Sequence, residues 1–146
     1  MYRLYRRSSS FLDSNVILLS DSKGLALNEI LSDDQKRKIR IIAKKGATIT
    51  YIELTRRVVR AVKNSSDPIV AVGFGTCEIT DKEGKYITIK SHPYQNIEFT
   101  LTKYREFRDK LLRENHNTKI VFLECPYYSI SRYNSRSKQC KDINNK

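Results

Sequence analysis

The chain has 146 residues, of which 39% are hydrophobic and 30% charged, and its formal net charge is +12. This length fits a single domain that buries roughly two thirds of the surface of the unfolded chain. No apolar run approaches the ~20 residues that a membrane span requires, and the first residues lack the apolar segment of a secretory signal peptide.

The first predicted elements are two strands followed by a helix. Residues 15–20 form a short continuous apolar run, which is typical of a strand buried on both faces. A short helix or loop leads to a second strand at 38–43, which is rich in β-branched isoleucine. Residues 50–64 predict a helix because apolar side chains recur at steps of three and four. Its predicted buried stripe consists of Tyr51, Leu54, Val58 and Val62.

The second half of the chain continues the alternation of strand and helix. A strand is predicted at 68–75, a surface hairpin at 79–91, a helix at about 96–114 and a fourth strand at 118–125. The predicted inner face of that helix consists of Ile97, Leu101, Tyr104 and Leu111. Alternation of this kind predicts an α/β protein with a doubly wound, mostly parallel sheet of about four strands.

The positive charge is concentrated in one internal segment and at the two ends. Residues 36–63 carry a net charge of +9, whereas residues 64–131 are neutral overall. The flanks, 1–14 and 132–146, are rich in Ser, Asn, Arg and Lys, and we interpret them as basic, flexible tails. This distribution favours an anionic partner, with nucleic acid the first candidate, and it equally fits a solvated basic surface without such a partner.

The cysteines indicate the cellular environment. Cys77, Cys125 and Cys140 are too few and too irregularly spaced for a disulfide framework or a zinc site. They favour a reducing, intracellular location, cytoplasmic or nuclear. The sequence predicts no cofactor and no metal.

Small, hydroxyl-bearing and charged residues follow each predicted strand. In open α/β sheets, binding sites form outside the carboxyl ends of the strands. We therefore expect the four segments that follow the strands to form one candidate site. These segments are residues 20–24, 45–48, 73–78 and 124–128.

The first of these segments resembles the signature of a known hydrolase family. Ser-Asp-Ser at 20–22 resembles the Gly-Asp-Ser block of the SGNH (GDSL-like) hydrolases, with Ser20 in place of the glycine. The family has a flavodoxin-like α/β fold and includes esterases, acyl hydrolases and thioesterases. The resemblance covers about residues 15–131, and it implies that Ser22 is the nucleophile and that its backbone N–H is an oxyanion donor.

Two further segments resemble later blocks of the same family. Gly46 stands where the family has a lone glycine whose N–H binds the oxyanion. Gly75 begins the segment that resembles the Gly-x-Asn-Asp block, in which Cys77 replaces the asparagine and Glu78 the aspartate. The resemblance thus implies an oxyanion site of Gly46, Gly75 and Cys77, with Asp21 and Glu78 as supporting residues.

The Asp-x-x-His block, which supplies the general base in this family, has no counterpart in the sequence. The two histidines are His92 and His116, and the residues three positions before them are Ile89 and Arg113. A serine hydroxyl is a weak nucleophile until a base removes its proton. The sequence therefore predicts a domain of ester-hydrolase ancestry whose catalysis is impaired or lost; if it is active, it is a serine esterase or acyl hydrolase.

Three alternatives stand beside this interpretation. Ser22 is equally well placed to cap a helix, since Ser and Asp are favoured at helix N-termini. The same turn, with Lys23, suits a phosphate group, although the glycine spacing of a nucleotide-binding loop is absent. The basic residues of 36–63 also suit a non-catalytic module that binds nucleic acid or another anionic partner. SGNH-like domains also occur in proteins encoded by some retroelements, so a retroelement origin of such a module is an open alternative.

Overall fold

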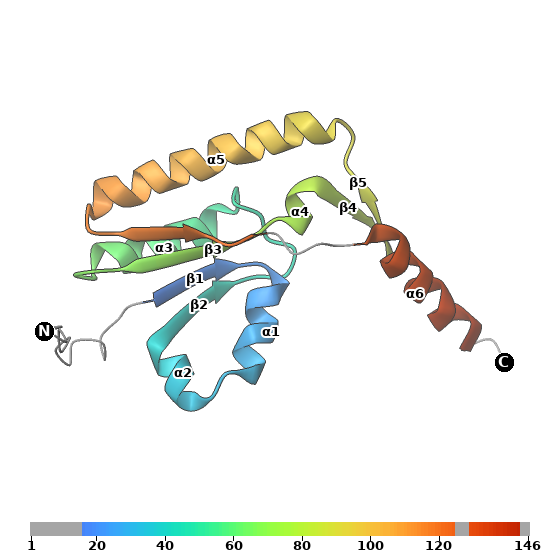
Figure 1. The fold of residues 1–146 in the computed structure, drawn as a ribbon, viewed down its shortest axis with the longest axis horizontal. Coiled ribbons are helices and arrows are strands. Elements are labelled where there is room, and N and C mark those ends of the chain that lie inside the picture. The colour runs from blue at the N-terminus through green and yellow to red at the C-terminus, as the bar shows by residue number, and fades with distance from the viewer. Residues whose placement is uncertain (1–15, 125–128, 144–146) are drawn as a thin grey trace, which may run out of the picture.

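A computed structural model describes residues 16–124 and 129–143 (Figure 1). The predicted N-terminal tail at 1–14 lies outside the described residues, and so do Cys125, Tyr127 and Tyr128. No helix in the described part of the chain is long and apolar enough to cross a membrane.

A four-stranded parallel sheet forms the centre of the molecule. The strand order is β2-β1-β3-β6, and each neighbouring pair runs in the same direction. The bounds are Val16–Ser20 for β1, Ile39–Ala43 for β2, Ile69–Gly73 for β3 and Lys119–Phe122 for β6. The predicted α/β class with a parallel sheet of about four strands is confirmed, and it is consistent with a flavodoxin-like fold.

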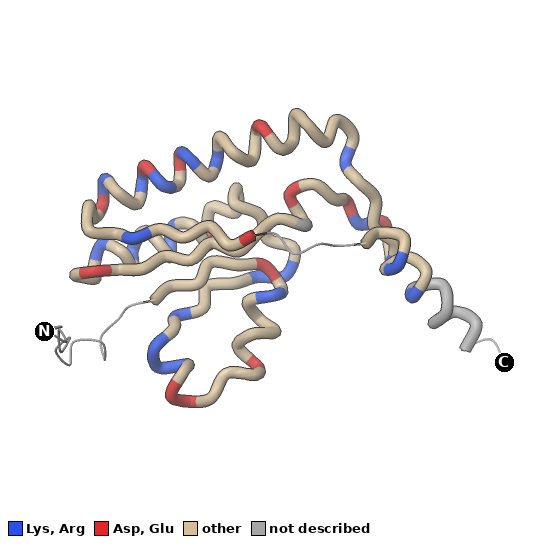
Figure 2. Tube along the Cα trace, viewed as in Figure 1, with Lys and Arg blue, Asp and Glu red and all other residues tan. Residues whose placement is uncertain are grey.

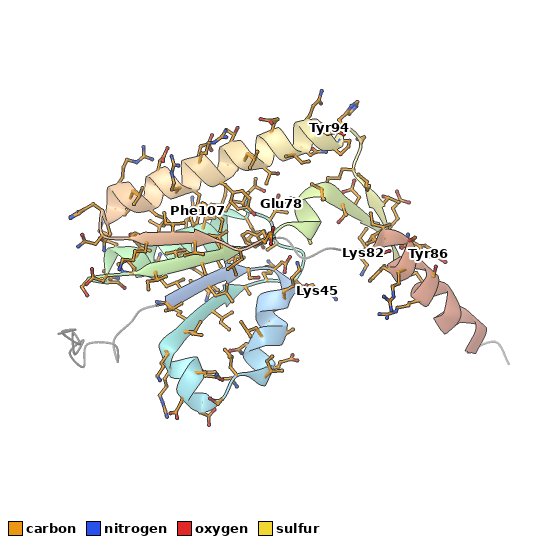
Figure 3. All side chains as sticks on the ribbon, in the orientation of Figure 1. Lys45, Glu78, Lys82, Tyr86, Tyr94 and Phe107 are labelled. Carbon is orange, nitrogen blue, oxygen red and sulfur yellow. The ribbon has the colours of Figure 1, made fainter. Side chains whose placement is uncertain are left out.

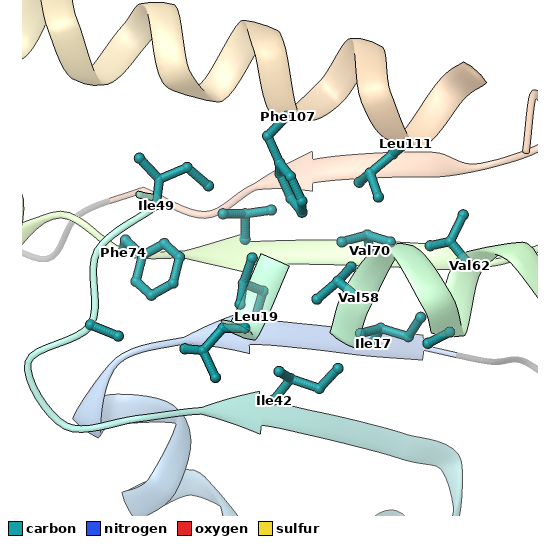
Figure 4. Close-up of a cluster of buried hydrophobic side chains, with 14 residues drawn as sticks. Ile17, Leu19, Ile42, Ile49, Val58, Val62, Val70, Phe74, Phe107 and Leu111 are labelled. Atoms are coloured by element: carbon teal, nitrogen blue, oxygen red, sulfur yellow. The ribbon is translucent and has the colours of Figure 1, made fainter. Parts of the chain in front are cut away.

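Helices connect the strands across both faces of the sheet. α1 (Ser22–Ile30) and the short α2 (Asp33–Lys38) join β1 to β2, and α3 (Ile52–Lys63) joins β2 to β3. α5 (Pro93–Glu114) leads into β6 and packs beside α3. The core lies between these two helices and the sheet (Figure 4), whereas α1 lies against β1 and β2 on the opposite face.

The buried core accounts for the hydrophobic patterns from which the strands and helices were predicted. Alternate strand residues face α3 and α5, since successive side chains of a strand point to opposite faces. Each fully buried Val, Leu or Ile side chain contributes about 1.5–3 kcal/mol through removal of apolar surface from water. The fully buried members include Ile17, Leu19, Ile42, Val58, Val62, Val70 and Leu111.

Two helices differ in detail from the sequence-based expectation. α5 begins at Pro93, three residues before the predicted start, because proline suits the first turn of a helix. Leu111 is buried as predicted. Phe107, which was not assigned to the predicted inner face, is also buried, whereas Ile97 and Leu101, which were assigned to it, are 40% and 41% exposed. Lys38, the first residue of the predicted second strand, belongs to α2, and β2 begins at Ile39 as an edge strand of the sheet.

The predicted surface hairpin is present and contacts a helix that the sequence did not indicate. β4 (Thr80–Glu83) and β5 (Tyr86–Ile89) pair in antiparallel fashion. α6 covers Ile130–Ile143, where we expected an unpacked tail from residue 132 onward. Asn134 of α6 hydrogen-bonds to the backbone of Ile87 in β5. Hairpin and helix lie at the end of the sheet toward which the strands run (Figure 1).

Candidate functional site

Three strand ends bring the predicted site residues to one edge of the sheet, which we call the rim. Ser20 pairs with Ala43 of β2 on one side and with Gly73 of β3 on the other. The chain therefore leaves β1, β2 and β3 at the same level and on the same side. The candidate site requires that these three parallel strands end side by side, because the residues that follow them must lie close together.

Ser22 is the first residue of α1, and Asp21 is its N-cap. The Asp21 carboxylate accepts hydrogen bonds from the Lys23 backbone N at 3.0 Å and from the Lys23 Nζ at 2.7 Å. Asp21 is 1% exposed, whereas Ser22 is exposed. Asp21 thus caps the helix, and the Ser22 hydroxyl makes no hydrogen bond within the described part of the chain.

Ser20, which stands in place of the family's glycine, has a structural role. Its side chain is 3% exposed, and its Oγ donates to the Gly73 carbonyl oxygen at 2.8 Å. This bond links the carboxyl ends of β1 and β3. Ser20 therefore fixes the spacing of the two strands directly beneath the rim.

Gly46 lies in the turn that follows β2. Its φ of 71° is in the left-handed region, which glycine adopts without strain. The Ala47 N donates to the Lys44 carbonyl oxygen at 3.1 Å and closes the turn. Among the described residues, the Gly46 N–H has no acceptor, and neither has the Ser22 N–H. Both amides are available to an anionic group.

The rim contains a pocket of about 590 Å³, which we call the rim pocket. It brings together Asp21, Ser22, Gly46 and Cys77. Gly75 and Glu78 instead line a second, largely apolar pocket of about 450 Å³ against α5. The rim pocket thus unites three of the four residues proposed for nucleophile and oxyanion site, whereas Gly75, which directly precedes the short helix α4 (Thr76–Ile79), lines only the second pocket.

Cys77 is half-buried at the wall of the rim pocket. Burial raises the pKa of its thiol, and the nearby Asp21 carboxylate raises it further. The thiolate is the reactive form of cysteine, so a raised pKa keeps this residue unreactive near neutral pH. A protonated thiol is also a much weaker hydrogen-bond donor than the asparagine amide of the SGNH block.

Glu78 anchors the loop that follows β2. Glu78, which is labelled in Figure 3, is only 8% exposed, and its Oε1 accepts from the Ile49 backbone N at 2.6 Å. Burial raises the pKa of this carboxyl, and the Ile49 N–H and Lys90 oppose the shift. Glu78 therefore holds the loop after β2, as Asp21 caps α1, and it lines the second pocket rather than the rim pocket.

Neither histidine lies at the rim pocket. His92 is the exposed N-cap of α5 and has a left-handed φ of 56°. His116 lies between α5 and β6, at the opposite end of the sheet from the rim. No histidine lines the rim pocket in the residues that the structure describes, and no group of three or more potential metal ligands occurs among them.

Sequence reasoning missed the part of the pocket that the hairpin supplies. Lys82 and Lys90 come from the hairpin region, Tyr133 comes from α6, and Lys45 precedes Gly46. Nothing in the local sequence pattern shows that the hairpin folds back toward the ends of β1 and β2. Lys45 could have been predicted from the sequence, since it lies in a segment that was already assigned to the site.

The chain matches no protein-family model, and no curated protein is significantly similar to it.

Proposed function

We propose that this chain is an SGNH-hydrolase-like domain that binds a ligand at the rim pocket and does not hydrolyse esters through Ser22. The observation that carries the proposal is the rim pocket itself. It combines Ser22, Gly46 and Cys77 from three successive strand ends, and its described lining contains no histidine. An intracellular location, cytoplasmic or nuclear, fits this proposal because Cys77 is a free thiol.

The chemistry of the lining supports binding over catalysis. Ester hydrolysis requires a base next to the serine hydroxyl and strong donors at the position of the oxyanion. Asp21 is engaged with the backbone and ammonium of Lys23, so the carboxylate nearest in sequence serves the helix cap. Cys77 offers a thiol where an amide donor would lower the barrier, and loss of one such donor costs about 3–4 kcal/mol in enzymes.

Comparison of the wild type with Ser22→Ala tests this proposal. We expect both proteins to release p-nitrophenol from a short p-nitrophenyl ester at the same slow rate, and we expect neither to react with a fluorophosphonate probe. Ser22→Ala leaves the Asp21 cap intact because the capping bonds do not involve the Ser22 side chain. Turnover or labelling that disappears in Ser22→Ala would overturn the proposal.

A second candidate function is nucleic-acid binding by the outer face of α3. This helix presents Arg56, Arg57, Arg60 and Lys63 to solvent, and none of them forms an ion pair within residues 16–124 and 129–143. On α5, by contrast, basic and acidic residues alternate (Figure 2). Unpaired cations on one helix face suit a phosphate backbone.

Salt-dependent binding of a DNA duplex tests the second candidate. The affinity is expected to fall as salt rises, and Arg56→Gln/Arg57→Gln/Arg60→Gln is expected to make the dependence shallower, because each phosphate contact contributes about 0.9 to the slope. The matched control replaces Arg105, Arg108 and Arg113 of α5 with glutamine. An absence of binding at low salt would exclude this function.

A further inference from the structure

The rim pocket is strongly cationic. Its lining includes four lysines and two aspartates, which leaves an excess of two positive charges on its wall. The lysines come from three separate parts of the chain, so no local pattern of the sequence creates the cluster. They are Lys23 of α1, Lys45 of the turn after β2, Lys82 of β4 and Lys90 after β5.

Two of the four ammonium groups have internal acceptors. Lys23 pairs with Asp21 at 2.7 Å. The Lys90 Nζ donates to the carbonyl oxygens of Cys77 at 3.1 Å and Glu78 at 3.2 Å. An ammonium group has three donors, so these contacts position Lys90 and leave it one further hydrogen bond.

Lys45 and Lys82 have no such acceptors. Both side chains are exposed, and neither ammonium group forms a hydrogen bond or an ion pair with any residue that the structure describes. They approach the pocket from different elements, the turn after β2 and the hairpin (Figure 3). Like charges on one pocket wall repel each other, and a bound anion would replace this repulsion with attraction.

We infer that the rim pocket binds a small molecule through a phosphate dianion held by Lys45, Lys82 and Lys90. The inference rests on the proposed function, in that it names the ligand class of a rim that binds without hydrolysis. The two excess positive charges match a dianion better than a carboxylate monoanion. The Ser22 hydroxyl and the N–H groups of Ser22 and Gly46 add uncharged donors at the same rim.

The size and composition of the pocket favour a small molecule over a polynucleotide. A volume of about 590 Å³ lies within the range of small-molecule sites. Ile87 and Tyr133 offer apolar surface for the organic part of such a ligand. The hairpin contributes Thr80, Asp81 and Lys82 to the same lining, so acidic as well as basic groups border it. An acidic group at the border disfavours a long polyanion.

Isothermal titration of the full chain with phenyl phosphate, inorganic phosphate and benzoate tests the inference. We expect saturable binding of both phosphates, with affinity that rises from pH 5 to pH 7 as the monoester loses its second proton near a pKa of about 6. Benzoate, which carries one charge on a similar ring, is expected to bind at least about tenfold more weakly, because it offers fewer charged acceptors.

Lys45→Gln/Lys82→Gln is the deciding variant, and Lys110→Gln/Lys119→Gln is its matched control. The control removes the same charge from exposed lysines of α5 and β6, which do not line the pocket. We expect the first variant to lose about tenfold or more in affinity for phenyl phosphate and the control to keep the wild-type value. Equal affinities of the two variants, or no saturable binding by the wild type, would overturn the inference.

A DNA oligonucleotide in the same titration separates the other source of phosphate. If Lys45→Gln/Lys82→Gln weakens binding of the oligonucleotide while phenyl phosphate does not bind, the rim serves a polynucleotide and the inference is wrong. The result is independent of the test of the proposed function. Heat of binding does not report hydrolysis, and a Ser22-dependent esterase that is inhibited by phosphate would overturn the proposed function alone.

Discussion

Ser20 and Gly24 are coupled by direct contact beneath the rim. A Cβ on Gly24 would lie 2.7 Å from the Ser20 Cβ and 3.0 Å from the Ala43 Cβ, which is too close for carbon atoms. Gly24→Ala is therefore expected to destabilise the protein by about 1–3 kcal/mol, despite the higher helix propensity of alanine. Urea denaturation measures the free energy of unfolding.

A double-mutant cycle identifies the cause of this cost. In the Ser20→Gly background the main clash is absent, so Gly24→Ala is expected to cost less by about 1 kcal/mol. The Ala43 contact remains in both backgrounds, which keeps the rescue incomplete. Equal costs in the two backgrounds would show that Ser20 does not determine the glycine at position 24. The side chain of Ser20 thus requires a glycine at position 24 of α1, the helix that begins at Ser22.

Glu78 makes the stability of the protein depend on pH. Burial raises its pKa in the folded state, so between the unfolded and folded pKa values the native protein keeps a proton that the unfolded chain has lost. The stabilising contribution is complete below the unfolded value, which is about 4.3 for a glutamate, and it is lost as pH rises through the folded pKa. Glu78→Gln keeps an oxygen acceptor for the Ile49 N–H and removes the charge.

We expect the stability of Glu78→Gln relative to the wild type to increase from pH 4.5 to pH 7.5. Urea denaturation at steps of pH gives this difference directly, because all other titrating groups are common to both proteins. Glu83→Gln, which removes an exposed carboxylate near the same hairpin, serves as the matched control against which the change for Glu78→Gln is measured. A flat difference for Glu78→Gln would contradict the raised pKa.

At the scale of helices and strands, the side chain of Asn115 links the carboxyl ends of α3 and α5. Its Nδ2 donates to the carbonyl oxygens of Val62, in the last turn of α3, at 3.1 Å and of Ser65, just after that helix, at 2.6 Å. Asn115→Ala removes both bonds, together with the bond that its Oδ1 accepts from the Asn117 N at 3.0 Å, and we expect a loss of about 1–3 kcal/mol in the free energy of unfolding.

Asn117→Ala is the control for this substitution. Asn117 is exposed, and its side chain makes no hydrogen bond in the described part of the chain, so its replacement is expected to change stability by less than about 0.5 kcal/mol. Thermal or urea unfolding of both variants gives the comparison. A cost of Asn115→Ala no larger than that of the control would show that the two helices do not depend on this link.

The elements that the sequence predicted are those whose own residues carry the burial pattern. β1, β3 and α3 each contain a regular set of apolar residues, such as Leu54, Val58 and Val62, and their bounds agree with the expectation to within one or two residues. α6 has no such pattern, and the hydrogen bonds between its Asn134 amide and the Ile87 backbone are polar contacts. A periodic pattern of hydrophobic residues does not predict polar contacts of this kind.

The same distinction applies to the candidate site. Ser22, Gly46 and Cys77 were placed together because parallel strands must end at a common edge, and the rim pocket unites them. Gly75 was assigned to the same site by the same reasoning as Cys77, but it lines the second pocket against α5 and not the rim pocket. The lysines at 82 and 90 depend on where the hairpin folds, which is a tertiary property without a local signal.

At the scale of the whole molecule, the sheet and the hairpin with α6 differ in how they are held. β1 and β3 are central strands that pair on both sides and carry the buried core. The hairpin has two strands only and is joined to α6 by the Asn134 amide, whose Oδ1 accepts from the Ile87 N at 3.0 Å and whose Nδ2 donates to the Ile87 O at 2.9 Å. Such a region opens locally at a lower free energy than the core.

Hydrogen exchange of the Ile87 amide in Asn134→Ala tests this difference. Because the substitution removes both bonds to Ile87, we expect its amide to exchange about tenfold faster, while the amides of Leu19 and Val70 keep their wild-type rates. Ser135→Ala is the control on the same helix, since the Ser135 hydroxyl donates only to the Ser131 carbonyl. If the Leu19 amide accelerates together with that of Ile87, the hairpin and the sheet unfold as one unit, and the lysines that the hairpin brings to the rim pocket are as firmly placed as Ser22.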